Sequence, residues 1–281
     1  MKPFISIQCR TWALIALIGS VASACTASVP AGEQTPSAVP SVVPSSTSLP
    51  TPQETPAPAP TAAPTSEPVK FTYRLNANYD VVPIDPNGNK KVVLLTFDDG
   101  PKELELNEKL LAALEKHRAK AIFFVNGYRV KQHPELLKLI HSKGQTIGNH
   151  SWDHIDLKKE KPEKVDAQIR DVQQLVRDTV GSAPLFFRPP YGSGSDYVKQ
   201  RAKEEKLLYM TWSNGSEDWV EKYQNPPAVI KRVLEQLHNG SNILMHEVPW
   251  TADALDELIT QLEAKGYSFV DPSSIETAAT P

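Results

Sequence analysis

Two acidic residues and two histidines in this chain have the residue types and spacing of a metal site. The stretch "LLTFDDGP" ends an apolar run with the adjacent carboxylates Asp98 and Asp99, which repel one another unless a cation offsets their charge. The stretch "HSWDH" places His150 and His154 four residues apart, so that on a helical turn both imidazoles lie on one side. Two histidines and one carboxylate are a common ligand set for catalytic zinc and leave one position for water. We therefore expect Asp99 to complete a divalent metal site with the two histidines, while Asp98 faces the bound water.

Taken singly, these motifs also have ordinary structural explanations. An H-x-x-x-H pair is commonly a solvated or capping pair, and Asp-Gly is a frequent turn. A shared site is favoured because polar or ionisable residues follow five of the seven strand-like segments of the chain. These residues are Asp98–Asp99, His150 and His154, Arg188–Gly192 in "RPPYG", Asp218–Trp219 in "SNGSEDW", and His246–Glu247 in "ILMHE". We infer that they meet on one face of the folded domain.

The elements that must position these residues alternate between strand and helix. Strands are predicted at 92–97, 121–125, 146–148, 185–187, 207–212, 242–245 and 268–270. Helices are predicted at 103–117, 134–144, 162–181, 195–205, 227–240 and 251–266. This alternation, with connections too long for hairpins, predicts an α/β fold with a parallel sheet covered by helices. A closed barrel and an open doubly wound sheet both fit, and both place functional groups at the carboxyl ends of the strands.

The first 24 residues have the composition of a secretory signal. Lys2 and Arg10 precede an apolar stretch, "WALIALIGSVASA", that is too short to span a bilayer comfortably. Small residues lead directly to Cys25, as in bacterial lipoproteins, so we expect Cys25 to be lipidated and to form the mature N-terminus. Ordinary cleavage at the same bond and a retained anchor are the alternatives. The only other cysteine, Cys9, lies inside the signal, so no internal disulfide is expected in the mature protein.

Residues 25–68 are expected to form a disordered linker. From 28 to 68 they are almost entirely Pro, Ser, Thr, Ala and Val, a composition that buries too little apolar area to offset the entropy of ordering. At roughly 3.1 Å per residue, this tether reaches on the order of 100 Å, enough to hold a domain away from a membrane within a cell wall. A plain secretion linker is the alternative. The folded domain is expected at 69–281, with its core at 91–270 and with 71–90 as an extra strand or N-terminal flap.

The charge of the chain argues against nucleic acid as a partner. The sequence has 30 basic and 33 acidic residues, a formal net charge of −3. Removing the signal removes two basic residues and no acid, which makes the balance more negative. No basic tract follows the signal, whereas proteins that bind phosphate backbones concentrate Lys and Arg.

In this order, the fragments "TFDDG", "HSWDH", "RPPYG", "DW" and "ILMHE" resemble the polysaccharide deacetylase family, also called the NodB homology domain or carbohydrate esterase family 4. The resemblance covers residues 91–270, nearly the whole folded part. It implies a distorted (β/α) barrel with about seven parallel strands. It also implies metal-dependent hydrolysis of an N-acetyl group on a sugar polymer. The metal that best suits two histidines and one aspartate is Zn, and Co, Ni or Mn can also occupy such a site.

The resemblance further implies a role for each site residue. Asp98 resembles the general base, and the metal ligands are matched by Asp99, His150 and His154. Arg188 resembles an arginine that orients the base, and Asp218 resembles an orienter of that arginine. The remaining matches are Tyr191 for a backbone N–H that holds the oxyanion, Trp219 and Leu244 for walls of the acetyl pocket, and His246 for the general acid.

Two positions depart from the family pattern. Gly215 stands where an acid is often found, three residues before the aspartate of "DW". Glu247 follows His246 where the family usually has Asp. Both changes concern residues that support the site, and the acid that orients His246 is not evident from the sequence.

The sequence leaves several functions open. The leading hypothesis is a secreted, lipid-anchored and monomeric deacetylase acting on N-acetylglucosamine residues of peptidoglycan, a chitin-like polymer or a biofilm polymer. It would contact the membrane only through its lipid. An O-acetyl esterase acting on a polymer such as acetylxylan would need nearly the same catalytic centre. A wall-binding module that keeps the groove without turnover is the alternative from another class.

Overall fold

The structure is a computed structural model in which residues 71–277 are described. The expected signal at 1–24, the lipidation site Cys25 and the linker at 25–68 lie outside the described residues. Within residues 71–277, no helix has both the length and the apolar composition needed to cross a bilayer.

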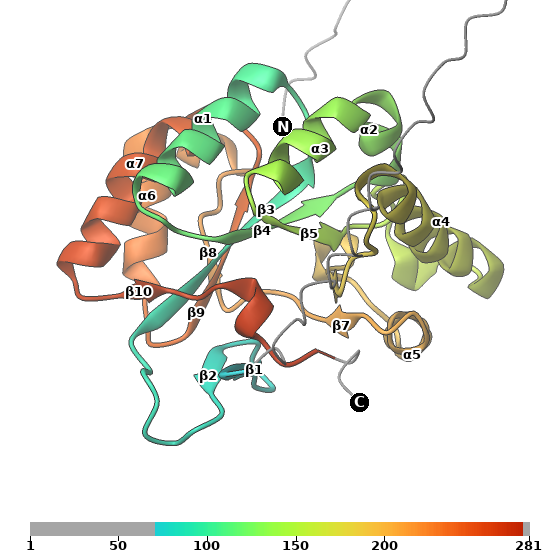
Figure 1. The fold of residues 1–281 in the computed structure, drawn as a ribbon, viewed down its shortest axis with the longest axis horizontal. Coiled ribbons are helices and arrows are strands. Elements are labelled where there is room, and N and C mark those ends of the chain that lie inside the picture. Colours follow the sequence, from blue (N-terminus) through green and yellow to red (C-terminus); the bar gives the residue numbers. More distant parts are fainter. Residues whose placement is uncertain (1–70, 278–281) are drawn as a thin grey trace, which may run out of the picture. The chain divides into compact units, whose positions relative to one another are not determined.

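The domain is built on a parallel sheet with the spatial strand order β7-β6-β5-β4-β3-β9-β8 (Figure 1). The strands are β3 (Val92–Gly100), β4 (Ala121–Val125), β5 (Thr146–Asn149), β6 (Phe186–Phe187), β7 (Leu208–Tyr209), β8 (Asn214–Gly215) and β9 (Ser241–His246). A further strand, β10 (Ser268–Phe269), runs parallel to the start of β3. The sheet curls into a distorted (β/α) barrel, as predicted. Among the described residues no strand pairing joins β7 to β8, so the barrel is open at that seam.

In the part of the chain that the structure describes, seven α-helices cover the outside of this sheet. They are α1 (Leu104–Lys116), α2 (Gly127–Gln132), α3 (Pro134–Ser142), α4 (Pro162–Val180), α5 (Asp196–Glu204), α6 (Pro226–Glu235) and α7 (Pro249–Ala264). Neighbouring helices pack in the order α6, α7, α1, α3, α4, α5, which follows the strands beneath them (Figure 1). Several begin with Pro at the first turn, where the missing N–H costs nothing because that group has no partner within the helix.

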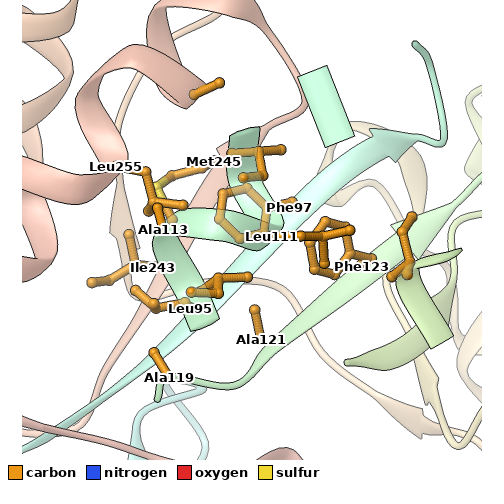
Figure 2. Packing of buried hydrophobic residues seen from close by; sticks show 14 of the residues in the cluster. Leu95, Phe97, Leu111, Ala113, Ala119, Ala121, Phe123, Ile243, Met245 and Leu255 are labelled. Atoms are coloured by element: carbon orange, nitrogen blue, oxygen red, sulfur yellow. The ribbon is translucent and has the colours of Figure 1, made fainter. Parts of the chain in front are cut away.

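Alternation along the central strands separates two apolar cores. Val93, Leu95 and Phe97 of β3 face the helices, and Figure 2 shows this layer packed with Met245 of β9. Val92 and Leu94 face the barrel interior instead. Because successive side chains of a strand point to opposite faces, Thr96 and Asp98 continue the interior row. The same parity on β9 sends Asn242, Leu244 and His246 toward the interior.

The seven predicted strands and six predicted helices are all present, with small shifts at their ends. Three further features of residues 71–277 are two single elements, β8 and α2, and one two-stranded hairpin. β8 contains only two paired residues, and α2 is six residues long and begins at a glycine, so neither carries a readable period. The third is an antiparallel hairpin of β1 (Tyr73–Leu75) and β2 (Val81–Pro83), in the region expected to add a strand or flap.

This hairpin packs against the start of β9. The Val81 N–H donates to the Gly240 carbonyl at 2.8 Å, and the His238 ring lies 2.8 Å from Asp80. Gly240 has a φ of +82°, and a Cβ there would collide with the backbone of Val81. Glycine at this turn therefore permits the close approach of the hairpin to the barrel.

Candidate active site

The carboxyl ends of the strands surround a cleft of about 360 Å³. Its walls come from β3, the loop after β5, the turn after β6, the segments around β8, and β9. The lining residues are Asp98, Asp99, His150, His154, Tyr191, Gly192, Trp212, Trp219, Leu244 and His246. Eight of these were predicted site residues. The other two predicted residues in the described part of the chain, Arg188 and Asp218, are buried directly behind the cleft.

The end of β3 brings two adjacent carboxylates to the same side. By strand alternation Asp98 faces the interior, and Asp99 should face the helices with Phe97. The pairing of β3 with β4 instead shifts register between Asp98 and Gly100, and Asp99 has a φ of +68°. A left-handed conformation is costly for a residue with a side chain and occurs frequently at functional positions. The local distortion therefore turns Asp99 into the cleft beside Asp98.

Three potential ligand atoms converge at this point. One atom each from Asp99, His150 and His154 lies within 4.8 Å of the others, a spacing that could hold a metal ion. Asp99 Oδ1 lies 3.2 Å from His154 Nε2 and 3.6 Å from His150 Nε2. This oxygen is buried, yet no hydrogen-bond donor within residues 71–277 reaches it. A buried carboxylate oxygen that faces two imidazole nitrogens without accepting a proton is what a ligand set requires.

The protein backbone fixes the orientation of one ligand. His150 Nδ1 lies 2.6 Å from the Arg188 carbonyl oxygen, which can only accept, so Nδ1 carries the proton. In the neutral ring the lone pair is then on Nε2, the nitrogen that faces Asp99. A histidine ligand oriented by a carbonyl on its other nitrogen is the usual arrangement in metal sites. The residues present therefore fit a divalent ion.

Burial and charge shift the pKa values of two of these ligands, Asp99 and His154. Burial favours the neutral acid at Asp99, but nearby His150, His246, His154 and Lys102 outweigh this effect and lower its pKa. Burial lowers the pKa of His154, against the opposing effect of the Asp99 carboxylate. Both shifts are in the direction that favours ligation, toward the ionised carboxylate and the neutral imidazole.

Asp98 is held by a buried arginine, as predicted. Arg188 Nη1 donates to Asp98 Oδ1 at 2.7 Å, and both side chains are almost completely buried. The guanidinium also lies over the Phe124 ring, with its central carbon 4.4 Å from the ring centroid. This positive charge offsets the repulsion between the adjacent carboxylates. Asp98 Oδ2 remains on the cleft side, 3.6 Å from His150 Nε2.

The predicted role of Asp218 is wrong. Asp218 was expected to orient Arg188, but its carboxylate contacts His246 instead. Oδ1 accepts from His246 Nδ1 at 2.7 Å, and Oδ2 accepts from the His246 backbone N–H at 2.8 Å and from Thr251 Oγ1 at 2.6 Å. Asp218 is therefore the acid that orients His246, which the sequence had not identified. The arginine is oriented by Thr96, Thr211 and Asn242.

This contact favours the protonated form of His246. Burial alone would lower the pKa of the imidazole, but the hydrogen bond and charge of Asp218, assisted by Asp98 and Asp99, raise it above the ordinary value. Asp218 thus shifts the balance at His246 toward the imidazolium form. Thr251, which helps to hold Asp218, was missed because a threonine near the start of a helix has no distinctive sequence signal.

Aromatic side chains form the mouth of the cleft. Tyr191 is 67% exposed and its ring packs edge-on to His154, with centroids 4.8 Å apart. Trp219 is 47% exposed and stands edge-on to His246 at 5.3 Å and to Trp212 at 6.4 Å. Large exposed rings beside polar groups suit sugar rings, which offer an apolar face. Leu244 is buried and supplies an apolar wall between them.

Glu247, which departs from the family pattern, is buried behind β3. Its Oε2 accepts from the Lys102 backbone N–H at 3.2 Å and from Asn107 Nδ2 at 3.1 Å. Its Oε1 has no hydrogen-bond partner within the described residues. A Cβ at Gly100 would overlap this carboxyl group, so the glycine gives Glu247 its space. Burial raises the pKa of Glu247 to about 7.

Comparisons with known proteins show which family this chain resembles. The family model described as polysaccharide deacetylase matches residues 85–210. A peptidoglycan-N-acetylglucosamine deacetylase of Bacillus cereus is 35% identical over 215 residues, covering 74% of each chain. The chain belongs to the polysaccharide deacetylase family.

Other relatives are longer than this chain. The peptidoglycan-N-acetylmuramic acid deacetylase PdaC of Bacillus subtilis is 38% identical over 194 residues, which are 69% of this chain and 40% of PdaC. The peptidoglycan-N-acetylglucosamine deacetylase PgdA of Listeria monocytogenes is 42% identical over 197 residues, 70% of this chain and 41% of PgdA. This chain therefore matches only about two fifths of either relative.

Solved structures share the fold. The structure of PdaC from Bacillus subtilis superposes with a TM-score of 0.61 at 37% identity, covering 68% of this chain and 91% of that one. BA3943 from Bacillus anthracis, described as a CE4 family pseudoenzyme, gives a TM-score of 0.63 at 29% identity, covering 68% and 69%. Members with and without activity thus share this architecture.

Proposed function

We propose that this protein is a metal-dependent hydrolase that removes N-acetyl groups from N-acetylglucosamine residues of a cell-wall or surface polysaccharide and releases acetate. One observation carries the proposal. A single cleft brings the Asp99, His150 and His154 cluster together with a carboxylate held by Arg188 and an imidazole held by Asp218. The relatives named as peptidoglycan deacetylases support a cell-wall polymer as the substrate, with chitin-like and biofilm polymers as further members of the class.

We propose Asp99, His150 and His154 as ligands of one divalent ion. Zn²⁺ suits this donor set best, and Co²⁺, Ni²⁺ or Mn²⁺ are the alternatives. When bound, such an ion supplies Lewis-acid polarisation of the acetyl carbonyl and lowers the pKa of the attacking water.

Asp98 acts as the general base. It accepts one proton from the water as the water oxygen bonds to the acetyl carbon. Its partner Arg188 donates to Oδ1 and leaves Oδ2 on the cleft side. The Tyr191 backbone N–H donates to the carbonyl oxygen as negative charge develops there.

His246 acts as the general acid. The carbon–nitrogen bond breaks as His246 gives its proton to the sugar nitrogen, which leaves as an amine, while the acetyl group leaves as acetate. Asp218 fixes the ring so that Nδ1 keeps its hydrogen bond and Nε2 faces the substrate. Trp219 and Leu244 enclose the acetyl methyl group.

The N-terminal region completes the proposal. We propose export by the signal at 1–24, lipidation of Cys25 and a monomeric domain at 69–281 that reaches into the wall on its linker. Several relatives are named as peptidoglycan deacetylases, and peptidoglycan lies outside the cytoplasmic membrane, which supports this placement.

Acetate release from N-acetylglucosamine oligomers and from peptidoglycan tests the proposal. The purified protein is assayed as isolated, after chelation, and after Zn²⁺ or Co²⁺ is restored, with Asp98→Asn as the matched variant. We expect release that requires the metal and is lost in Asp98→Asn. Release only from O-acetylated xylan would assign an esterase. Substrate binding without release in metal-loaded protein would assign a non-catalytic module, as in the pseudoenzyme relative.

A further inference from the structure

The Arg188 guanidinium is fully hydrogen-bonded in the barrel interior. Nη1 donates to Asp98 Oδ1 at 2.7 Å and to Thr96 Oγ1 at 2.8 Å. Nε and Nη2 both donate to the Thr211 carbonyl, at 3.2 and 2.9 Å. The last N–H, on Nη2, donates to Asn242 Oδ1 at 3.3 Å. Five N–H groups thus have five acceptor contacts, which fix the plane of the guanidinium.

The neighbours of Asn242 determine which end of its amide meets the arginine. Asn242 Nδ2 lies 3.0 Å from the Thr211 carbonyl oxygen and 3.3 Å from the Tyr79 carbonyl oxygen. Carbonyl oxygens only accept, so both contacts require the NH₂ group. The amide oxygen must then point to Arg188, where only a donor is present. The turn of the N-terminal hairpin, through Tyr79, therefore helps to set this orientation.

Asn242 is a polar residue at a buried strand position that an apolar side chain would normally fill. It is fully buried on the interior face of β9, two residues before Leu244 and four before His246. An amide in such a place is unfavourable unless all its polar atoms are paired, and here they are. Its contacts lead from the hairpin through the arginine to the carboxylate proposed as the base.

We propose that Asn242 is a positioning residue for the deacetylation reaction, acting on Asp98 through Arg188. It touches neither substrate nor the ligand cluster, and it holds the guanidinium in the plane from which Nη1 meets Asp98. This inference rests on the proposed function. A small displacement of a catalytic group can lower the rate of the chemical step by about 10- to 100-fold.

Asn242→Leu tests the proposal, because leucine has a similar volume and cannot accept from Nη2. Asn214→Leu is the matched control. Asn214 is also a fully buried asparagine in a strand of this sheet, but its amide donates to the Val233 carbonyl and has no contact with Arg188. Both variants lose a buried hydrogen bond, so both are expected to unfold at lower temperature than the parent protein.

Only Asn242→Leu should lower kcat on N-acetylglucosamine oligomers, by about 10-fold or more, with KM and metal content within twofold of the parent. An equal kcat for the two leucine variants would overturn the proposal. If Asn242→Leu does not fold, Asn242→Ser replaces it, since the shorter hydroxyl cannot span the contact to Nη2. A kcat of Asn242→Ser equal to that of the parent would also overturn it.

A second substitution asks whether the effect passes through the arginine. Arg188 Nη1 donates to two side chains, Asp98 and Thr96, and Thr96→Val removes the second of these acceptors. If both residues act on Arg188, the kcat loss of the double variant is smaller than the product of the single losses. Losses that multiply would show that Asn242 acts by another route.

Nitrogen-15 spectra of arginine side chains separate this inference from the proposed function, because they require no turnover. A guanidinium held on all sides gives distinct Nη1 and Nη2 signals. We expect these signals to merge in Asn242→Leu and to stay distinct in Asn214→Leu. Distinct signals in both variants would refute the positioning role even in an inactive protein, whereas absence of acetate release from every polymer would refute only the function.

Discussion

The two sides of the cleft satisfy their polar groups differently. On the His246 side, the Asp218 carboxylate accepts three hydrogen bonds from the protein, at 2.6 to 2.8 Å. On the Asp99 side, one carboxylate oxygen is buried beside two imidazoles without accepting a hydrogen bond from residues 71–277. Each side contains an aspartate that faces a histidine. Within the described residues, both carboxylate oxygens of Asp218 accept hydrogen bonds, whereas Oδ1 of Asp99 accepts none.

This difference suits the two sides of the cleft to different roles: the His246 side to proton transfer and the Asp99 side to metal binding. The hydrogen bond and charge of Asp218 raise the pKa of His246, which favours the protonated imidazole. A carboxylate that faces neutral imidazoles without a shared proton has the electron pairs that a cation needs. The predictions below alter one side at a time, beginning with the largest expected effect.

Asp99→Ala should abolish metal binding by the Asp99, His150 and His154 cluster. Loss of one of three ligands removes most Lewis-acid assistance, so we expect kcat/KM to fall about 1000-fold or more. Metal content after dialysis, measured by mass spectrometry, should fall in parallel. A variant that keeps its full metal content and its activity would show that Asp99 is not a ligand.

His246→Ala should break the other side and leave metal content unchanged. Loss of a general acid costs about 100- to 10,000-fold in rate. The parent should show a bell-shaped pH–rate profile, because Asp98 must be ionised while His246 is protonated. The alkaline limb should disappear in His246→Ala. An alkaline limb that persists unchanged would remove His246 from the acid role.

Asp218→Asn should weaken the same side more mildly. Asp218 raises the pKa of His246, so removing its charge lowers that pKa and the imidazole loses its proton at lower pH. The alkaline limb should move toward lower pH, with a loss of about 10- to 100-fold near the optimum. Rates measured across a pH series decide this. No movement of the limb, or movement toward higher pH, would contradict the pairing of Asp218 with His246.

Glu247→Gln should affect stability more than chemistry. Burial raises the pKa of Glu247 from 4.5 to about 7, so its contribution to stability is fully present below pH 4.5 and is lost as pH rises through about 7. Glutamine keeps the shape without that titration. Relative to the parent, the variant should therefore gain up to about 3 kcal/mol between these limits. Urea unfolding at pH 4.5 and 8 measures this, and a difference that does not change with pH would refute it.

The sequence predicted the strands, the site residues and their convergence because each depends on local pattern. A run such as "VVLLTF" is a buried strand in any parallel sheet, and polar residues at several strand ends must meet at one edge. The direction of an individual side chain depends on distant neighbours. Asp218 follows the two-residue strand β8, and whether it reaches Arg188 or His246 is set by how β8 lies beside β9, which no spacing in the sequence encodes.

Two other features had no readable signal for related reasons. Asn242 stands in "NILM", which reads as an apolar strand, and its pairing with Arg188 spans 54 residues of chain. The turn of Asp99 into the cleft arises from a register shift between β3 and β4. Both depend on the assembled sheet, so they become visible only in three dimensions.

The bond between the Arg188 carbonyl and the His150 ring has a consequence for the order of assembly. It belongs to the folded backbone, so the ligand orientation is established when the sheet forms. Capture of the proposed ion would then be a bimolecular event that follows folding, with a rate that depends on the free ion concentration around the folded protein. A chain exported unfolded would therefore acquire the ion available at its destination, and the compartment, as much as the donor set, would decide which metal it carries.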